Sequence, residues 1–189
     1  MKFDPTIRLQ CDEGVYEPSE DTRMLIEAIS ISYGQKVLEI GCGTGIIALH
    51  CAKMGAKVTG SDVSEGAVRC AKKNAKLNKL KIDIKKSDLL ANIEGQFDVI
   101  VFNPPYLPRD YVNDIRWTGG DLGFEMTLKF LQQCRNHLQP KGKIYTAAST
   151  MTDVSEFERA SSSLGYTIRR VSEKKFFFEQ LIVYELGLS

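Results

Sequence analysis

The residues Asn103-Pro104-Pro105-Tyr106 are the part of the chain whose types and spacing indicate chemistry most directly. They follow the apolar run 97–102, which is typical of a buried strand, and the two prolines prevent a strand or a helix from continuing. The Asn103 side chain offers an amide oxygen, and Pro104 offers a carbonyl without an N–H of its own. Two neighbouring acceptors suit an –NH2 group, so the sequence predicts a site that handles a planar amine or amide.

A glycine-rich turn follows the strand that is predicted at Lys36–Ile40. Gly41, Gly43 and Gly45 form a G-x-G-x-G pattern, which permits a tight turn and lets a ligand approach the backbone closely. The pattern differs from the dinucleotide fingerprint G-x-G-x-x-G, and no P-loop lysine follows it. The turn therefore argues against both a dinucleotide and a nucleoside triphosphate, although glycine turns also occur for structural reasons alone.

Acidic residues are predicted at the carboxyl ends of three successive strands. Glu39 could face a positively charged ligand group, and Asp62 could accept hydrogen bonds from both hydroxyls of a ribose. Asp88 could accept a hydrogen bond from an adenine amino group while Leu89 packs on the ring. Each acid alone could equally be a solvated loop carboxylate or a helix cap, but their joint placement favours one shared ligand.

Strands and helices alternate along the chain, which predicts an α/β fold with a doubly wound, mostly parallel sheet. Helices are expected from Ser19 to about Ser32, from about Gly45 to Met54, and at the apolar repeats within 67–75, 124–138 and 154–164. Five strands are expected at Lys36–Ile40, Lys57–Ser61, Ile82–Lys86, Phe97–Phe102 and Lys143–Ala148. Two final strands, at about 166–171 and 180–186, have no helix between them and are expected to pair as an antiparallel hairpin. Ligands of such sheets bind at the carboxyl ends of the strands.

Length and composition favour one domain over 1–189, divided into an N-terminal segment with a lid helix (1–35), a cofactor half (36–106) and a substrate half (107–189). The 25 Lys and Arg residues nearly balance the 24 Asp and Glu residues, so no global field attracts nucleic acid or membrane. The five cysteines include no C-x-x-C pair, and neither a signal peptide nor an apolar run of about 18 residues is found. We therefore expect a cytoplasmic protein without a structural metal or a disulfide framework.

Taken together, these motifs resemble the class I S-adenosylmethionine-dependent methyltransferases. The resemblance rests on the segment 37–45, on Asp62, on Asp88-Leu89 and on the turn at Asn103. It implies a Rossmann-like, seven-stranded sheet whose last strand is antiparallel, and S-adenosyl-L-methionine as the cofactor. Asn-Pro-Pro-Tyr in particular resembles the signature of enzymes that methylate planar nitrogen, namely N6-adenine and N4-cytosine DNA methyltransferases and HemK-like glutamine N5-methyltransferases.

Two further segments, 15–22 and 117–125, resemble the short eukaryotic and archaeal release-factor branch of the HemK-like enzymes. In that branch, the threonine that matches Thr22 lies beside the cofactor. The implied substrate is the glutamine of the Gly-Gly-Gln motif in a class I peptide release factor. A small zinc-ribbon activator subunit is the implied partner.

The resemblance also implies which residues carry the reaction. The Asn103 oxygen and the Pro104 carbonyl would accept both N–H bonds of the glutamine amide, with Tyr106 as an aromatic wall; Pro105 completes this substrate-binding turn. The expected cofactor-binding residues are Thr22, Glu39, Gly41, Gly43, Asp62, Asp88, Leu89 and Asn103. No metal is expected.

Three alternative functions stay open: methylation of a nucleic-acid amine, methylation of a protein lysine, and a cofactor-binding subunit without activity of its own. Near-neutral charge disfavours the first, a lysine needs no amide clamp, and an inactive subunit needs no intact Asn-Pro-Pro-Tyr turn. The basic stretch 69–86 is either a solvated face or a docking surface, and Phe176–Phe178 either pack in the core or border a peptide groove. The loop 107–121 is expected to border the substrate, through charged residues that either grip a peptide or are simply solvated: Arg109, Asp110, Asp114 and Arg116.

Overall fold

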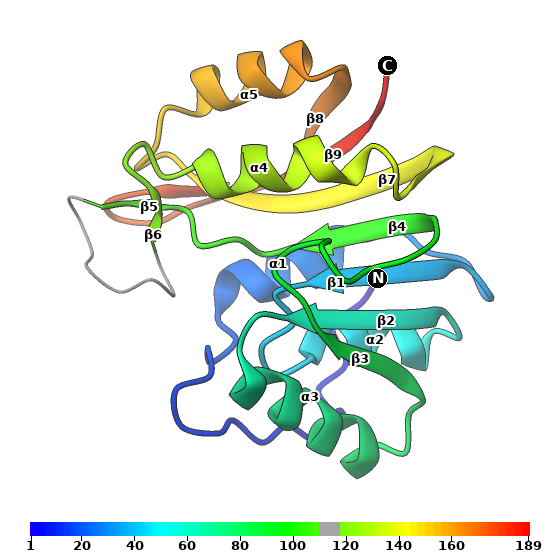
Figure 1. Cartoon of the computed structure of the whole chain (residues 1–189). Coiled ribbons are helices and arrows are strands. Elements are labelled where there is room, and N and C mark those ends of the chain that lie inside the picture. Colours follow the sequence, from blue (N-terminus) through cyan, green and yellow to red (C-terminus); the bar gives the residue numbers. More distant parts are fainter. Residues whose placement is uncertain (110–117) are drawn as a thin grey trace.

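The computed structural model describes residues 1–109 and 118–189. Seven strands form one sheet, in the spatial order β3 (Ile82–Lys86), β2 (Lys57–Asp62), β1 (Lys36–Ile40), β4 (Phe97–Phe102), β7 (Leu138–Ser149), β9 (Gln180–Leu188) and β8 (Tyr166–Lys175) (Figure 1). The first five strands in this order, β3 to β7, are parallel to one another. Strand β9 runs antiparallel to both β7 and β8. The predicted mostly parallel sheet with a C-terminal antiparallel hairpin is confirmed.

Helices cover both faces of this sheet: α1 (Glu20–Ala28), α2 (Ile46–Lys53), α3 (Glu65–Leu77), α4 (Glu125–Cys134) and α5 (Val154–Ser163). Side chains alternate between the two faces of a strand. Val37 and Val99 therefore pack with α1 and α2, whereas Leu38 and Ile100 pack with α4 and α5. Within the described part of the chain, no helix is long and apolar enough to cross a membrane.

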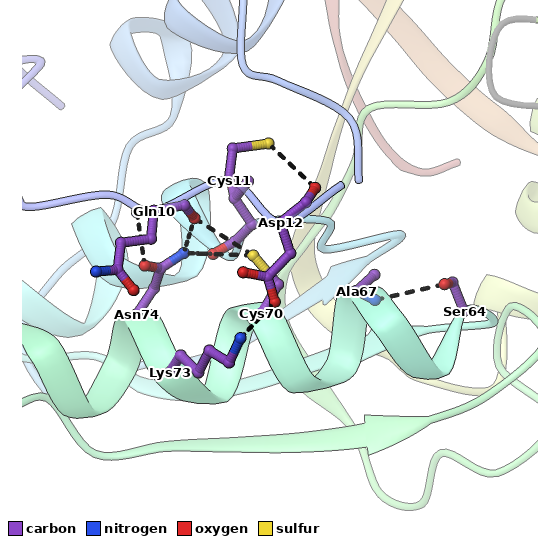
Figure 2. A network of polar contacts seen from close by, with 9 residues as sticks. Gln10, Cys11, Asp12, Ser64, Ala67, Cys70, Lys73 and Asn74 are labelled. Carbon is purple, nitrogen blue, oxygen red and sulfur yellow. Dashed lines mark hydrogen bonds and ion pairs between the residues drawn. The ribbon is translucent and has the colours of Figure 1, made fainter. Parts of the chain in front are cut away.

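The N-terminal segment 1–19 lies across α2 and α3 and is held there by side-chain amides. The Asn74 side chain accepts a hydrogen bond from the Gln10 N–H at 2.9 Å and donates to the Gln10 carbonyl at 2.8 Å and the Thr44 carbonyl at 2.9 Å. Figure 2 shows this network, together with the ion pair between Lys73 and Asp12 at 2.7 Å. The Asn74 side chain thus bonds both backbone groups of Gln10, as a neighbouring strand would, and connects the N-terminal segment to the glycine turn through Thr44.

The structure corrects several predicted boundaries. The first helix ends at Ala28 rather than near Ser32, because Ile29 has an extended backbone (φ −63°, ψ 129°) that buries its side chain. Ser19 precedes this helix, but its hydroxyl makes no capping bond and donates to Asp21 instead. The expected helical repeat to Leu138 was also too long, because Leu138 already pairs with Phe97 as the first residue of β7.

Two segments outside the predicted strands also contain strand structure. Strand β7 begins at Leu138, before the predicted start at Lys143, and it includes Pro140-Lys141-Gly142 at a register irregularity opposite β4. In the expected loop 107–121, β5 (Leu107–Pro108) and β6 (Thr118–Gly120) form a small parallel sheet. Extended segments this short carry no alternating apolar pattern, so periodicity could not indicate them.

Candidate functional site

A cavity of about 440 Å³ opens at the carboxyl ends of β1, β2 and β4 and the segment that follows β3. This volume is within the range of small-molecule sites in proteins. Its lining includes every residue that was predicted to bind the cofactor or the acceptor amide: Thr22, Glu39, Gly41, Gly43, Asp62, Asp88, Leu89, Asn103, Pro104, Pro105 and Tyr106. The fold therefore brings together residues that are up to 84 positions apart in the sequence (106 − 22).

The glycine turn between β1 and α2 needs glycine for two physical reasons. Gly41 has φ +61°, and a Cβ there would lie 3.2 Å from the Phe102 ring. Gly45 has φ +79° at the start of α2, where a Cβ would lie 3.1 Å from the Ala71 Cβ. Left-handed backbone favours glycine, and the crowding excludes larger residues. The turn therefore leaves backbone, rather than side chains, at the mouth of the cavity.

Asp62 is fixed by the same turn. One carboxylate oxygen accepts the Gly43 N–H at 3.0 Å, and the other accepts the Ser64 N–H at 2.8 Å. Asp88 is exposed, and its nearest cation is the Lys129 ammonium at 3.9 Å. The next residue, Leu89, is buried and has φ +47°, an uncommon conformation for a residue with a side chain. The structure thus places Asp62 and Leu89 in defined positions along the cavity wall.

Glu39 is 3% exposed, and its carboxylate accepts the Ala48 N–H at 2.8 Å. Burial is the main cause that raises the pKa of Glu39 to about 8; the Ala48 hydrogen bond lowers it, and the charge of Asp62 raises it further. At neutral pH this carboxyl group is mostly protonated. A cation that entered the cavity beside it would favour the charged form and release a proton. Within residues 1–109 and 118–189, no three His, Cys, Asp or Glu side chains are arranged to hold a metal ion.

Asp21 is the main functional candidate that the sequence analysis missed. This residue is 3% exposed, in the first turn of α1. It accepts hydrogen bonds from the Asn103 side-chain nitrogen at 3.0 Å, the Tyr106 hydroxyl at 3.0 Å, the Tyr16 hydroxyl at 2.8 Å and the Ser19 hydroxyl at 2.9 Å. In the sequence, Asp21 is one of two adjacent acids at the predicted start of a helix, which is a common position for an acid and indicates no site. A local pattern cannot reveal a contact with a residue 82 positions away.

Opposing effects act on the pKa of Asp21. Burial acts to raise this pKa, but hydrogen bonds from Asn103, Tyr16, Ser19 and the Thr22 N–H outweigh burial and hold it below its ordinary value. The carboxylate is therefore ionised at neutral pH and can only accept hydrogen bonds. Burial and the nearby Asp21 charge raise the pKa of Tyr106, so its hydroxyl stays protonated and donates to Asp21.

The ionised Asp21 decides which way the Asn103 amide faces. Oxygen and nitrogen of an amide are assigned from their hydrogen-bond partners, and only the nitrogen can donate to a carboxylate. The Asn103 nitrogen also lies 3.3 Å from the Thr22 hydroxyl oxygen. The Asn103 side-chain oxygen is then left buried, and no group of residues 1–109 or 118–189 donates a hydrogen bond to it. A buried acceptor without a partner costs about 1–3 kcal/mol, and a ligand that donates an N–H would recover that cost.

Other predicted features either do not line this cavity or lie outside the described residues. Of the four charged loop residues, Arg109 forms an exposed ion pair with Asp121 at 3.2 Å, whereas 110, 114 and 116 lie outside the described residues. The expectation that Phe176–Phe178 pack in the core was wrong, since Phe177 and Phe178 are 91% and 88% exposed. The basic stretch 69–86 carries lysines that are mostly exposed along α3 and β3.

Three comparisons with known proteins bear on this site. The family profile of the methyltransferase small domain matches residues 8–177. A protein of Methanocaldococcus jannaschii that is assigned to the protein N5-glutamine methyltransferases is 39% identical over 185 residues, which cover 94% of this chain and 93% of that protein. The release factor glutamine methyltransferase of Lactococcus lactis is 34% identical over 74% of this chain, which spans only 57% of that protein's length.

Among solved structures, the E. cuniculi Mtq2–Trm112 complex is described as responsible for the methylation of the translation termination factor eRF1. The matching chain of that complex superposes with a TM-score of 0.76 and 26% sequence identity. The match covers 93% of this chain and 99% of that one.

Proposed function

The chain belongs to the methyltransferase small domain family, and within it to the HemK-like protein N5-glutamine methyltransferases, and we propose that it methylates a glutamine side-chain amide in a class I peptide release factor. The proposed acceptor is the glutamine of the Gly-Gly-Gln motif. The observation that carries the proposal is the Asn103 side-chain oxygen, which is buried beside a cavity of cofactor size and has no hydrogen-bond partner among the residues that the structure describes. The relatives that are named for glutamine methylation support the choice of acceptor.

S-adenosylmethionine is the methyl donor of this family. The fit of the cavity to this cofactor is supported by the glycine turn, where a Cβ on Gly41 would meet Phe102, and by acids at neighbouring strand ends. We propose that Asp62 binds the ribose hydroxyls and Asp88 the adenine amino group, with Leu89 on the ring. The remaining contacts are assigned to Thr22, Glu39, Gly41, Gly43 and Asn103. When bound, the cofactor supplies a methyl group on a sulfonium sulfur, which keeps the electron pair of the broken bond.

The Asn103 turn is proposed to bind the acceptor amide. An amide nitrogen is a poor nucleophile because its lone pair is delocalised into the carbonyl. The Asn103 oxygen and the Pro104 carbonyl would accept its two N–H bonds, which orients the nitrogen and stabilises the positive charge that develops on it. Positioning of reactants in this way can contribute roughly 7–11 kcal/mol to the lowering of a barrier. The nitrogen that gains the methyl group releases one proton to water.

The role of Tyr106 in this proposal follows from its hydroxyl group. Because the hydroxyl donates to Asp21, the ring is held in one orientation at the cavity wall. A planar amide could then pack against the ring face, while Pro105 keeps the turn rigid. The division of the chain into a cofactor half, 36–106, and a substrate half, 107–189, stays part of the proposal.

A partner subunit and a location complete the proposal. The E. cuniculi relative is a complex with a second protein, which supports a small activator subunit for this chain as well. We propose that this subunit is a zinc-ribbon protein. Because release factors act on ribosomes, we also propose a cytoplasmic location.

Mass spectrometry of the acceptor tests the function. The chain is incubated with S-adenosylmethionine and the class I release factor of its own organism, with and without a candidate activator. We expect one added methyl group on the glutamine of Gly-Gly-Gln, and none with the Asn103→Ala variant. Parallel reactions with duplex DNA, transfer RNA and ribosomal proteins test the alternative acceptors. A methyl group on a lysine or on a nucleobase, with an unmodified glutamine, would refute the proposal.

A further inference from the structure

The turn between β8 and β9 presents an unusual apolar surface. Phe177 and Phe178 are 91% and 88% exposed, and their rings pack edge to face at a centroid distance of 4.7 Å. Phe176 beside them is 42% exposed and lies under the Lys174 ammonium at 5.5 Å. We call Phe176–Phe178 the aromatic tip. Adjacent exposed aromatic side chains have no role in the core of this protein and are characteristic of contact surfaces.

The sheet topology places the aromatic tip on the same edge as the Asn103 turn. Strands β4 and β7 are parallel, so their carboxyl ends, Phe102 and Ser149, point toward one edge of the sheet. Strand β9 is antiparallel and begins there, with Leu181 opposite Ser149. The β8–β9 turn therefore extends beyond the edge that carries the cavity. Figure 1 shows this hairpin reaching the side of the molecule where β5 and β6 lie.

Polar contacts connect the residues around the aromatic tip to β7 and to the start of α1. The Phe176 N–H donates to the Glu179 carbonyl at 2.7 Å and closes the turn. The Ser149 hydroxyl donates to the Glu179 carboxylate, and the Lys174 ammonium donates to Glu20 at 2.7 Å. Glu20 directly precedes Asp21, the residue that contacts Asn103. The tip is thus joined to the elements that hold the proposed acceptor-binding turn.

The size of the aromatic tip indicates what kind of partner it fits. A phenylalanine buries at most about 150–250 Å² in a contact, so Phe177 and Phe178 together offer about 300–500 Å². A stable protein–protein interface needs about 800 Å² from each partner. The tip alone is therefore too small to hold a second copy of this chain. It suits a partner that is already attached at a second point, and a side chain bound at Asn103 provides such a point.

We propose that the aromatic tip is a docking contact for the folded acceptor protein and binds an apolar patch near the methylated residue. This inference rests on the proposed function and extends it. Once the acceptor amide is bound at Asn103, contact with the aromatic tip forms within the same complex, and each contact then raises the occupancy of the other. The tip would thus recognise the acceptor as a folded protein, whereas the Asn103 turn would bind only the acceptor amide.

The test measures the wild type and the Phe177→Ser/Phe178→Ser double variant on two acceptors. The acceptors are the intact release factor and a short synthetic peptide centred on Gly-Gly-Gln, which cannot extend to the tip. We expect KM for the intact factor to rise about tenfold or more, equivalent to about 1.4 kcal/mol, with kcat retained. Activity on the peptide and the Kd for the cofactor should stay as in the wild type. Tyr33→Ser is the matched control, because Tyr33 is 89% exposed near the start of β1, at the opposite edge.

Several outcomes would overturn the inference, and they differ from failure of the proposed function. An unchanged KM for the intact factor would show that the tip does not contact the acceptor. An equal loss with factor and peptide would assign the tip to folding or catalysis instead. If sedimentation shows a wild-type dimer that the double variant loses, the occupant is a second copy of this chain. If the wild-type enzyme does not modify glutamine in either acceptor, the proposed function itself is wrong.

Discussion

The Asp21→Asn substitution tests whether a buried charge orients the Asn103 amide, the group proposed to bind the acceptor. It keeps the size of the side chain and removes the charge that fixes the Asn103 amide. The new amide can turn its nitrogen toward Asn103, and Asn103 then has to turn its own oxygen away from the acceptor. Alternatively, the new amide at position 21 keeps its oxygen toward the Asn103 nitrogen, and the hydrogen bond between them is then a neutral one. Either way, the preference for one Asn103 orientation becomes weaker.

The magnitude follows from the type of bond that is lost. A hydrogen bond to a charged group contributes about 1.5–3 kcal/mol, compared with about 1 kcal/mol for a neutral one. With 1.4 kcal/mol for each factor of ten, and some loss of order at Tyr106, kcat/KM should fall about 10- to 100-fold. The Asn103 side chain does not need Asp21 to stay in the cavity wall. We therefore expect the Kd for S-adenosylmethionine to change little.

Steady-state methyl transfer at saturating cofactor, with calorimetry for cofactor binding, measures this prediction. Ser19→Ala is the matched control, because the Ser19 hydroxyl donates to the same carboxylate at 2.9 Å but does not contact Asn103. It should reduce kcat/KM less than about threefold. Asp21→Asn with near-normal kcat/KM would refute the orientation argument, and so would an equal loss in Ser19→Ala.

A pH titration of stability separates charge from shape in the same variant. The folded-state pKa of Asp21 is below its ordinary value, so its contribution to stability is present above the unfolded pKa of about 3.9 and is lost as pH falls through the folded pKa. The free energy of unfolding in urea should therefore decrease more between pH 6 and pH 3 in the wild type than in Asp21→Asn. Equal decreases would mean that Asp21 is not ionised in the folded protein.

Four further predictions concern the Asn103 clamp, the Glu39 carboxyl group and the glycine turn. Asn103→Ala should lower kcat by several orders of magnitude while calorimetry still shows binding of S-adenosylmethionine; near-normal turnover would exclude the amide clamp. The Glu39 pKa of about 8 means that cofactor binding at pH 7 should release a proton, seen as buffer-dependent binding heat that Glu39→Gln abolishes. Because that pKa is raised, the wild-type free energy of unfolding should also fall as pH rises from about 4.5 to 8, whereas Glu39→Gln should not show this fall. Gly41→Ala should lower the free energy of unfolding by about 1–2 kcal/mol through its positive φ, and further through crowding against Phe102. Gly95→Ala is the control for the first effect, because Gly95 also has positive φ but a Cβ there would meet no atom within 4 Å. Urea unfolding measures both variants.

The sequence was sufficient for the sheet and for the residues around the cavity because both are locally encoded. Buried parallel strands are continuous apolar runs, and the residues that follow them meet at one edge of the sheet. Glu39, Asp62 and Asn103 could therefore be selected one strand at a time, without knowledge of their contacts. The ends of α1 and α4 were missed, because helix ends depend on which side chain the core buries and not only on helical spacing.

The parts that the sequence could not supply are those that depend on the position of one element against another. The aromatic tip has a residue composition that is equally suitable for a core, and only the antiparallel β9 shows that it extends past the edge of the sheet. Asp21 presents the same difficulty. Acids are common in the first turn of a helix, where they interact favourably with the positive end of the helix dipole. The residue type and position of Asp21 therefore indicate an ordinary exposed residue.

The packing of α1 explains why the first turn of this helix bears on the reaction. Leu25, Ile26 and Ile29 are fully buried in the cluster that includes Val99 and Val101 of β4. This packing fixes the start of α1 beside the end of β4, where the Asn103 turn begins. Asp21 and Thr22 then contact the Asn103 nitrogen at 3.0 and 3.3 Å. Since Thr22 is also a proposed cofactor contact, we propose that one helical turn both contacts the cofactor and orients the acceptor clamp. Substitutions at 21 and 22 should therefore not be energetically independent.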